Sequence, residues 1–202
     1  MRFIHALLLL ATLLLGGCAS NPMQVAASQT IAAPTDKTAQ VVFMRSSFVG
    51  SAINASVYDV TNDELVFIGI MANGTKLSYQ TAPGKRRFMV VSEAADFMEA
   101  DLAGGLTYYS MVTPRMGAWK ARFSLWPIKK SAPAEFHQGM ADFKSWREGT
   151  QLVGMTPAAQ QWFQANRADI EAKRKEYLVV WQRKSPSELQ ERTLGRNDGR
   201  RD

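Results

Sequence analysis

The segment Phe88-Met89-Val90-Val91, which follows the turn sequence Ala82-Pro83-Gly84-Lys85, decides how the chain must fold. A short apolar run bounded by turn residues is typical of a β-strand, and this run would be apolar on both faces. Val41–Met44 and Tyr108–Val112 are runs of the same kind. Strands that are apolar on both sides need cover on both faces. The sequence therefore predicts strands that lie between other layers of structure.

Short β-type runs continue on both sides of this segment, and turn signals such as Asn62-Asp63 and Asn73-Gly74 separate them. Eight runs follow this pattern: Gln40–Met44, Ala55–Val60, Leu65–Met71, Thr75–Gln80, Arg86–Ser92, Phe97–Leu102, Thr107–Thr113 and Ala121–Pro127. Their number and spacing indicate an antiparallel sandwich or barrel, and we predict a β-sandwich of about eight short strands over residues 39–130.

The last third of the chain has a helical pattern. Thr156-Pro157 supplies an N-cap and a proline at the first helical position, and no Gly or Pro follows until about Lys184. Ser185-Pro186-Ser187-Glu188 has the spacing of a capping box for a short last helix, and a shorter helix is expected over 133–147. We therefore predict an α+β fold in which a helical extension, residues 131–194, packs on the sandwich. Residues 195–202 are expected to be a disordered tail.

The beginning of the chain is typical of an export signal. Arg2 precedes an apolar run that is shorter than the roughly 20 residues of a membrane span, and small residues follow it. Leu15-Gly16-Gly17-Cys18 resembles the lipobox of bacterial lipoproteins. This resemblance implies that residues 1–17 are a signal peptide, which is cleaved off before Cys18. Cys18 would then carry the lipid.

The lipoprotein resemblance also implies a location. Ala19 and Ser20 follow Cys18 without an Asp, which in this class implies an outer-membrane lipoprotein that faces the periplasm. The membrane would then be contacted through the lipid anchor. Residues 18–38 are rich in Ala, Ser, Thr, Gln and Pro, so we expect a solvated tether there.

Composition excludes several kinds of chemistry. The chain has 202 residues, one Cys and two His, so neither a disulfide framework nor a thiolate metal site can form within it. We expect no cofactor and no metal. The net charge of +6 is a modest surplus, which favours either contact with anionic envelope polymers or simple solubility. Nucleic acid is not an expected partner of an exported protein.

Two residues are candidates for binding. Arg45 ends an apolar run, where it would form a surface ion pair, for example with Asp59, or bind a ligand. Trp119 is one of five Trp residues in the second half of the chain. Most of these indoles are expected in the core, and an exposed one would mark a contact with a protein, a glycan or a membrane surface.

Candidates for catalysis are few. His137 is the one His that remains after signal removal, and an exposed position on a helix is expected for it. Carboxylates gather at Glu93, Asp96, Glu99 and Asp101, where they would serve as an acid and base pair or, more simply, as solvated charge. No Gly-x-Ser-x-Gly elbow and no phosphate-binding glycine motif occurs in the sequence.

Several turn and strand motifs together resemble a known family, bacterial envelope lipoproteins of domain-of-unknown-function family 2846. The motifs are Val41-Val42-Phe43-Met44-Arg45-Ser46-Ser47, Gly50-Ser51-Ala52, Val57-Tyr58-Asp59, Ile68-Gly69, Ala72-Asn73-Gly74-Thr75, Ala82-Pro83-Gly84 and Gly104-Gly105-Leu106-Thr107-Tyr108-Tyr109. They span roughly residues 40–122. The resemblance implies a β-sandwich on a lipid anchor and no known activity.

Three classes of function stay open at this point. The first is a non-enzymatic envelope module that binds a protein or a glycan, or supports an assembly. The second is an envelope hydrolase that acts on glycan or lipid through the carboxylates or His137. The third is a carrier for a small ligand, with a pocket between sheet and helices.

Overall fold

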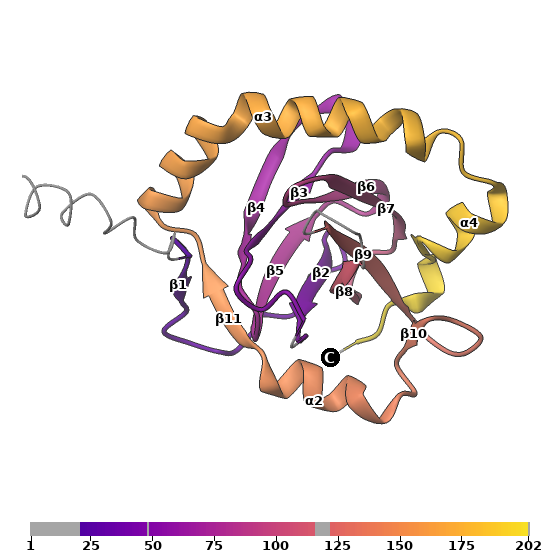
Figure 1. Ribbon diagram of the computed structural model, residues 1–202. Coiled ribbons are helices and arrows are strands. Elements are labelled where there is room, and N and C mark those ends of the chain that lie inside the picture. Colours follow the sequence, from indigo (N-terminus) through magenta and orange to yellow (C-terminus); the bar gives the residue numbers. More distant parts are fainter. Residues whose placement is uncertain (1–20, 48, 116–121, 202) are drawn as a thin grey trace, which may run out of the picture.

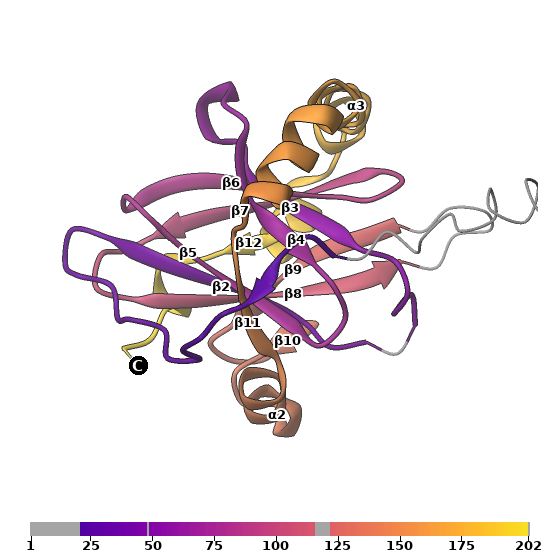
Figure 2. The same ribbon diagram turned by 90° about the vertical axis from the view of Figure 1, so that its left-hand side faces the viewer.

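The computed structural model describes residues 21–47, 49–115 and 122–201, which form a sheet-dominated α/β fold. Two β-sheets lie face to face in the middle of the molecule (Figures 1 and 2). Helix α2 (Ala141–Gly149) covers the outer face of one sheet, and α3 (Pro157–Trp181) covers the outer face of the other. A short helix, α4 (Pro186–Glu191), follows α3.

The eight expected β-runs correspond to strands β2 to β9. The first sheet has the order β1 (Gln24–Val25), β11 (Gln151–Gly154), β5 (Thr75–Thr81), β2 (Ala39–Arg45), β8 (Thr107–Arg115), β9 (Arg122–Lys129) and β10 (Phe136–His137). The second sheet has the order β12 (Thr193–Leu194), β7 (Ala95–Leu102), β6 (Gly84–Val91), β3 (Ala55–Asp59) and β4 (Val66–Met71).

Most neighbouring strands pair antiparallel, as predicted, but the arrangement is not antiparallel throughout. β2 runs parallel to β8, and three short strands, β10, β11 and β12, also pair in parallel with β9, β5 and β7. These short strands belong to segments that return to the sheets from the helical region. Strands of two to four residues carry too little alternation to be recognised in a sequence.

Alternation along the strands builds the central core. Val41 and Phe43 of β2 face the second sheet, where Phe43 meets Phe88 edge to face at 5.2 Å between ring centroids. Val42 and Met44 face the opposite way and pack with residues of α2. Strand β2 is therefore covered on both faces, by the second sheet and by α2, as its apolar sequence predicted.

Helix α3 begins where the sequence places its start. The Thr156 hydroxyl oxygen accepts a hydrogen bond from the Ala159 N–H at 3.0 Å, as an N-cap does. Phe163, Ile170 and Trp181 are buried against the outer face of the second sheet, in one cluster with side chains of β3, β6 and β7. Ser185 and Glu188 complete the predicted capping box of α4.

The helix expected over 133–147 is shorter than predicted, because α2 begins at Ala141. Phe136 and His137 form β10 instead, and the Gln138 N–H donates to the Lys129 carbonyl oxygen. Pro133 and Gly139 explain the difference, since both residues disfavour the interior of a helix. His137 therefore lies on a strand and not on an amphipathic helix.

Both ends of the described chain depart from the sequence-based expectation. The supposed tether packs on the domain, with β1 paired to β11, Met23 against the central core and Ile31 against the α2 cluster. At the other end, the N–H and carbonyl of Arg200 pair with those of Thr107. Residues 21–38 are mostly exposed, as predicted, but the segment pairs with the first sheet instead of extending free of the domain, and the prediction of a disordered tail from 195 is wrong for residues 195–201. Among these residues, no helix has the length and apolar character required to cross a membrane.

Candidate functional site

Several residues chosen from the sequence lie outside the part of the chain that the structure describes. They are Cys18, the preceding Leu15-Gly16-Gly17, and Trp119. The lipobox and the proposed role of Trp119 therefore stay predictions.

Arg45 is a buried structural residue and not part of a surface ion pair. Its guanidinium donates to the carbonyl oxygens of Met71 at 2.8 Å and Gly50 at 2.7 Å, and lies 4.3 Å from the centre of the Phe123 ring. Asp59 is instead 3.9 Å from Arg86. Burial lowers the pKa of Arg45 to about 10. The predicted pair with Asp59 is wrong, and Arg45 connects β2 of the first sheet to the end of β4 in the second.

The four carboxylates do not converge on one point. Asp96 is buried beside Arg192, Glu99 accepts from Arg87 Nε at 2.8 Å, and Asp101 is 3.2 Å from Arg196. Asp96 and Glu99 also lie on opposite faces of β7, because side chains alternate along a strand. Glu93 lines a separate cavity of about 200 Å³ beside α3.

His137 is half-buried in β10. Its backbone N–H points to the sulfur of Met140 at 3.4 Å, and its Nδ1 is buried with no hydrogen-bond partner in the described structure. Within that same portion of the chain, no three His, Cys, Asp or Glu side chains are grouped so that they would hold a metal ion.

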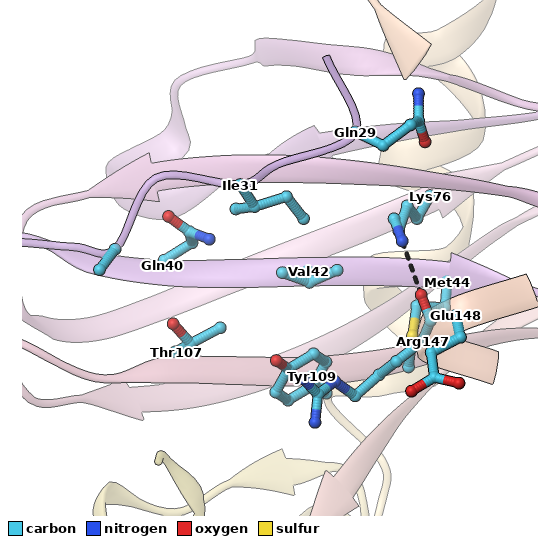
Figure 3. Close-up of a pocket in the computed structure, with 11 residues that line it drawn as sticks. Gln29, Ile31, Gln40, Val42, Met44, Lys76, Thr107, Tyr109, Arg147 and Glu148 are labelled. Atoms are coloured by element: carbon cyan, nitrogen blue, oxygen red, sulfur yellow. Dashed lines mark hydrogen bonds between the residues drawn. The ribbon is translucent and has the colours of Figure 1, made fainter. Parts of the chain in front are cut away.

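The candidate site is a groove on the outer face of the first sheet, with a volume of about 240 Å³ (Figure 3). Strands β2, β5 and β8 form its floor, the N-terminal segment forms one wall, and the C-terminal end of α2 forms the other. The lining residues are Gln29, Ile31, Ala33, Gln40, Val42, Met44, Lys76, Thr107, Tyr109, Arg147 and Glu148.

The strand register explains why these side chains meet. Met44 pairs with Lys76 across β2 and β5, and Val42 pairs with Tyr109 across β2 and β8. Gln40 and Val42 share the outward face of β2 with Met44, since alternate residues point to the same side. Val42 and Tyr109 therefore lie in the middle of the floor, while Gln40 and Thr107 lie toward one end and Lys76 and Met44 toward the other (Figure 3).

The N-terminal wall is held by a few polar contacts. The Gln29 side chain accepts from the Leu152 N–H at 2.7 Å and donates to the Leu152 carbonyl oxygen at 3.2 Å, as an added strand would. The Gln80 amide donates to the Ala32 carbonyl oxygen at 3.4 Å. Ile31 adds an apolar contact with the cluster under α2.

The other end of the groove is cationic. Lys76 is only 9% exposed, and its Nζ donates to the Arg147 carbonyl oxygen at 2.6 Å. Burial lowers the pKa of Lys76, and the nearby positive charge of Arg147 lowers it further. The Arg147 guanidinium lies over the rings of Tyr109 and Phe143, at 5.5 and 5.6 Å from their centres. A positive charge at the C-terminal end of α2 is also favoured by the helix dipole.

A larger and more open cavity, of about 660 Å³, lies between β9 and α4 beside Trp126. Glu135 and Glu191 line it, together with Lys129. The Lys129 ammonium already donates to the Gln190 and Thr193 carbonyl oxygens. The groove on the first sheet is the stronger candidate, because it combines an apolar floor with a buried positive charge.

Sequence reasoning left open a pocket between sheet and helices, but it selected none of the residues that line this groove as a binding residue. The only signal of the groove was the placement of polar Gln40 and Lys76 within β-runs, and a polar residue in a strand usually faces solvent. Comparisons with known proteins add no further guide, since no family model, no curated protein and no solved structure matches the chain.

Proposed function

We propose that this chain is a lipid-anchored binding module of the bacterial envelope that faces the periplasm at the outer membrane. The anchor in this proposal is Cys18, from the sequence Leu15-Gly16-Gly17-Cys18. As part of the same proposal, the chain is similar to envelope lipoproteins of family 2846, and its two sheets form a β-sandwich.

The groove is the observation that carries the proposal. Three segments that are distant in sequence enclose it, and small-molecule sites are concave surfaces of this kind with an apolar lining and a few placed polar groups. A non-enzymatic role is supported by the separate ion pairs of Asp96, Glu99 and Asp101, which leave those carboxylates engaged in holding the fold. Within the binding class, the groove favours a small ligand over a large partner.

The anchor would lie close to the folded domain. The described structure begins at Asn21, three residues after Cys18, and three residues span at most about 10 Å. The lipid would therefore hold the domain near the membrane surface, with the N-terminal wall of the groove on its membrane-proximal segment.

Recovery of the bound molecule from cells tests this proposal. The protein is crosslinked in the cell, extracted from membranes, and analysed by mass spectrometry for bound molecules. Ala33→Trp places a large side chain on the wall of the groove, whereas Ala32→Trp places the same side chain on an exposed neighbour that does not line it. We expect a bound molecule to be recovered with the wild-type protein and with Ala32→Trp, and to be lost from Ala33→Trp.

Cys18→Ser separates anchoring from binding. We expect this variant to leave the outer-membrane fraction while its groove is unchanged. A molecule that all variants retain equally would exclude the groove as the binding site. A wild-type protein that carries no bound molecule would count against a binding module.

A further inference from the structure

We infer that the groove selects a ligand with one negative charge on a small apolar body, and that Lys76 and Arg147 bind a carboxylate at its cationic end. This inference rests on the proposed function, because it names the chemistry of the ligand in that groove. It concerns specificity and requires no chemical step.

The position of Lys76 is the first argument. Its side chain is more than nine-tenths buried, it lines the groove, and no carboxylate pairs with it among the described residues. The Arg147 carbonyl oxygen accepts one of the three donors of the ammonium. A buried charge is unfavourable unless an opposite charge compensates it. A ligand carboxylate at this end of the groove would supply that compensation.

Arg147 is the second argument. Its guanidinium lies over the ring of Tyr109 on β8, across β2 from Lys76 on β5 (Figure 3). A guanidinium presents a planar fork of donors that matches the two oxygens of a carboxylate. The pKa of Lys76 is lowered first by burial and then by the positive charge of Arg147, so both residues make this end of the groove positive.

Among the described residues that line the groove, one is acidic. Glu148 follows Arg147 at the end of α2, is exposed, and is 4.0 Å from Lys144 one turn earlier. This exposed charge is screened by solvent, whereas Lys76 is not, so the buried positive charge dominates the field inside the groove.

The rest of the lining defines the body of the ligand. Ile31 and Val42 offer an apolar surface in the middle, Met44 adds to it beside Lys76, and Gln40 and Thr107 close the far end with polar groups (Figure 3). A volume of 240 Å³ equals that of about eight water molecules at roughly 30 Å³ each. This size suits a carboxylate of about ten non-hydrogen atoms, such as octanoate.

Calorimetric titration of the lipidated full chain in phosphatidylcholine nanodiscs tests the inference, with empty nanodiscs as the blank. The probes are octanoate, 1-octanol and octylammonium, which share one apolar body and differ in charge. We expect octanoate to bind at least tenfold more tightly than octanol, and octylammonium to bind most weakly.

Three variants assign the effect to the buried charge. Lys76→Gln keeps a donor for the Arg147 carbonyl and removes the charge, whereas Lys76→Arg keeps the charge. Lys144→Gln removes a charge from the same side of the molecule, but its side chain is 82% exposed and does not line the groove. We expect a loss of tenfold or more in octanoate affinity for Lys76→Gln, a smaller loss for Lys76→Arg and no change for Lys144→Gln. Circular dichroism and thermal unfolding verify that each variant is folded.

The outcomes separate this inference from the proposed function. Equal binding of octanoate and octanol that Lys76→Gln does not alter would overturn anion selection and leave the groove as a binding site. A protein that binds no octanoate at millimolar concentration would also overturn the inference. The proposed function would still be decided separately, by whether Ala33→Trp loses the molecule recovered from cells. The titration is repeated in phosphatidylglycerol nanodiscs, where a lipid phosphate would compete with octanoate for the groove. Loss of octanoate binding there would assign the site to a lipid phosphate and overturn its assignment to a free carboxylate.

Discussion

Arg192 and Asp96 form a buried ion pair that joins the end of the helical region to both sheets. Their side chains are 7% and 0% exposed, and Arg192 also donates to the carbonyl oxygens of Leu125 in β9 and Phe97 in β7. The Arg192 guanidinium lies 4.5 Å from the centre of the Trp126 ring. One side chain thus closes the edge where the first sheet, the second sheet and α4 meet.

Removal of this arginine is expected to destabilise the fold strongly. Arg192→Met leaves Asp96 buried without its partner, and breaking a buried pair in this way costs about 3–5 kcal/mol of unfolding free energy. Urea unfolding followed by tryptophan fluorescence measures the loss. Arg196→Met is the matched control, because its pair with Asp101 is exposed and should contribute less than about 1 kcal/mol. Equal effects of the two substitutions would contradict the structural role given to Arg192.

The helical region should be required for a soluble domain. A chain that ends at Lys130 loses Phe163, Ile170 and Trp181, which cover the outer face of the second sheet. Exposure of Tyr58, Met89 and other apolar groups on that face would promote association. We expect aggregation or higher oligomers in size-exclusion chromatography. A soluble monomer of unchanged stability would show that the sheets do not depend on α3.

Much of this fold could be predicted from the sequence, because its signals are local. The apolar runs that include Val41–Met44 and Phe88–Val91 gave the strands, and Thr156-Pro157 gave the start of α3. The parallel pairing of β2 with β8 had no such signal, since it depends on contacts between residues more than 60 positions apart.

The groove could not be predicted for the same reason. Its cationic end joins Lys76 to Arg147, which is 71 positions away, through the backbone carbonyl of the arginine. Neither residue belongs to a motif, and both resemble ordinary charged surface residues when they are considered alone. Arg45 shows the opposite case, because the sequence identified an unusual residue and the structure assigns it to the interior.

The cap of α4 predicts a measurable acid dependence. The Ser185 N–H and hydroxyl and the nearby Lys184 lower the pKa of Glu188 from 4.5 to about 2. A carboxylate with a lowered pKa in the folded state stabilises the protein above its unfolded pKa, and this stabilisation is lost as the pH falls through the folded pKa. The contribution of Glu188 should therefore be complete above about pH 4.5 and disappear toward pH 2.

Ser185→Ala tests this assignment. It removes the hydroxyl and leaves the Ser185 backbone N–H, which donates to Glu188 at 2.8 Å. We expect the pKa of Glu188 to rise only part of the way to 4.5, as measured by carbon NMR titration of its carboxyl group. Ser187→Ala is a suitable control, because Ser187 contacts the Ser185 hydroxyl and not the carboxylate. An unchanged pKa in Ser185→Ala would rule out a contribution from the hydroxyl.

The N-terminal segment gives the last prediction, since it belongs both to the fold and to the groove. A chain that begins at Ala39 keeps β2 to β12 but loses β1, Met23 and the wall formed by Gln29, Ile31 and Ala33. Partly buried side chains such as Met23 and Ile31 contribute about 1–2 kcal/mol each, so we expect a folded domain with a lower thermal midpoint. Ligand affinity should also fall, and by more than the lower stability of the domain explains, because the groove becomes an open sheet face. A molten product would contradict a domain boundary at residue 39, and undiminished affinity would show that the N-terminal segment is not a wall of the site.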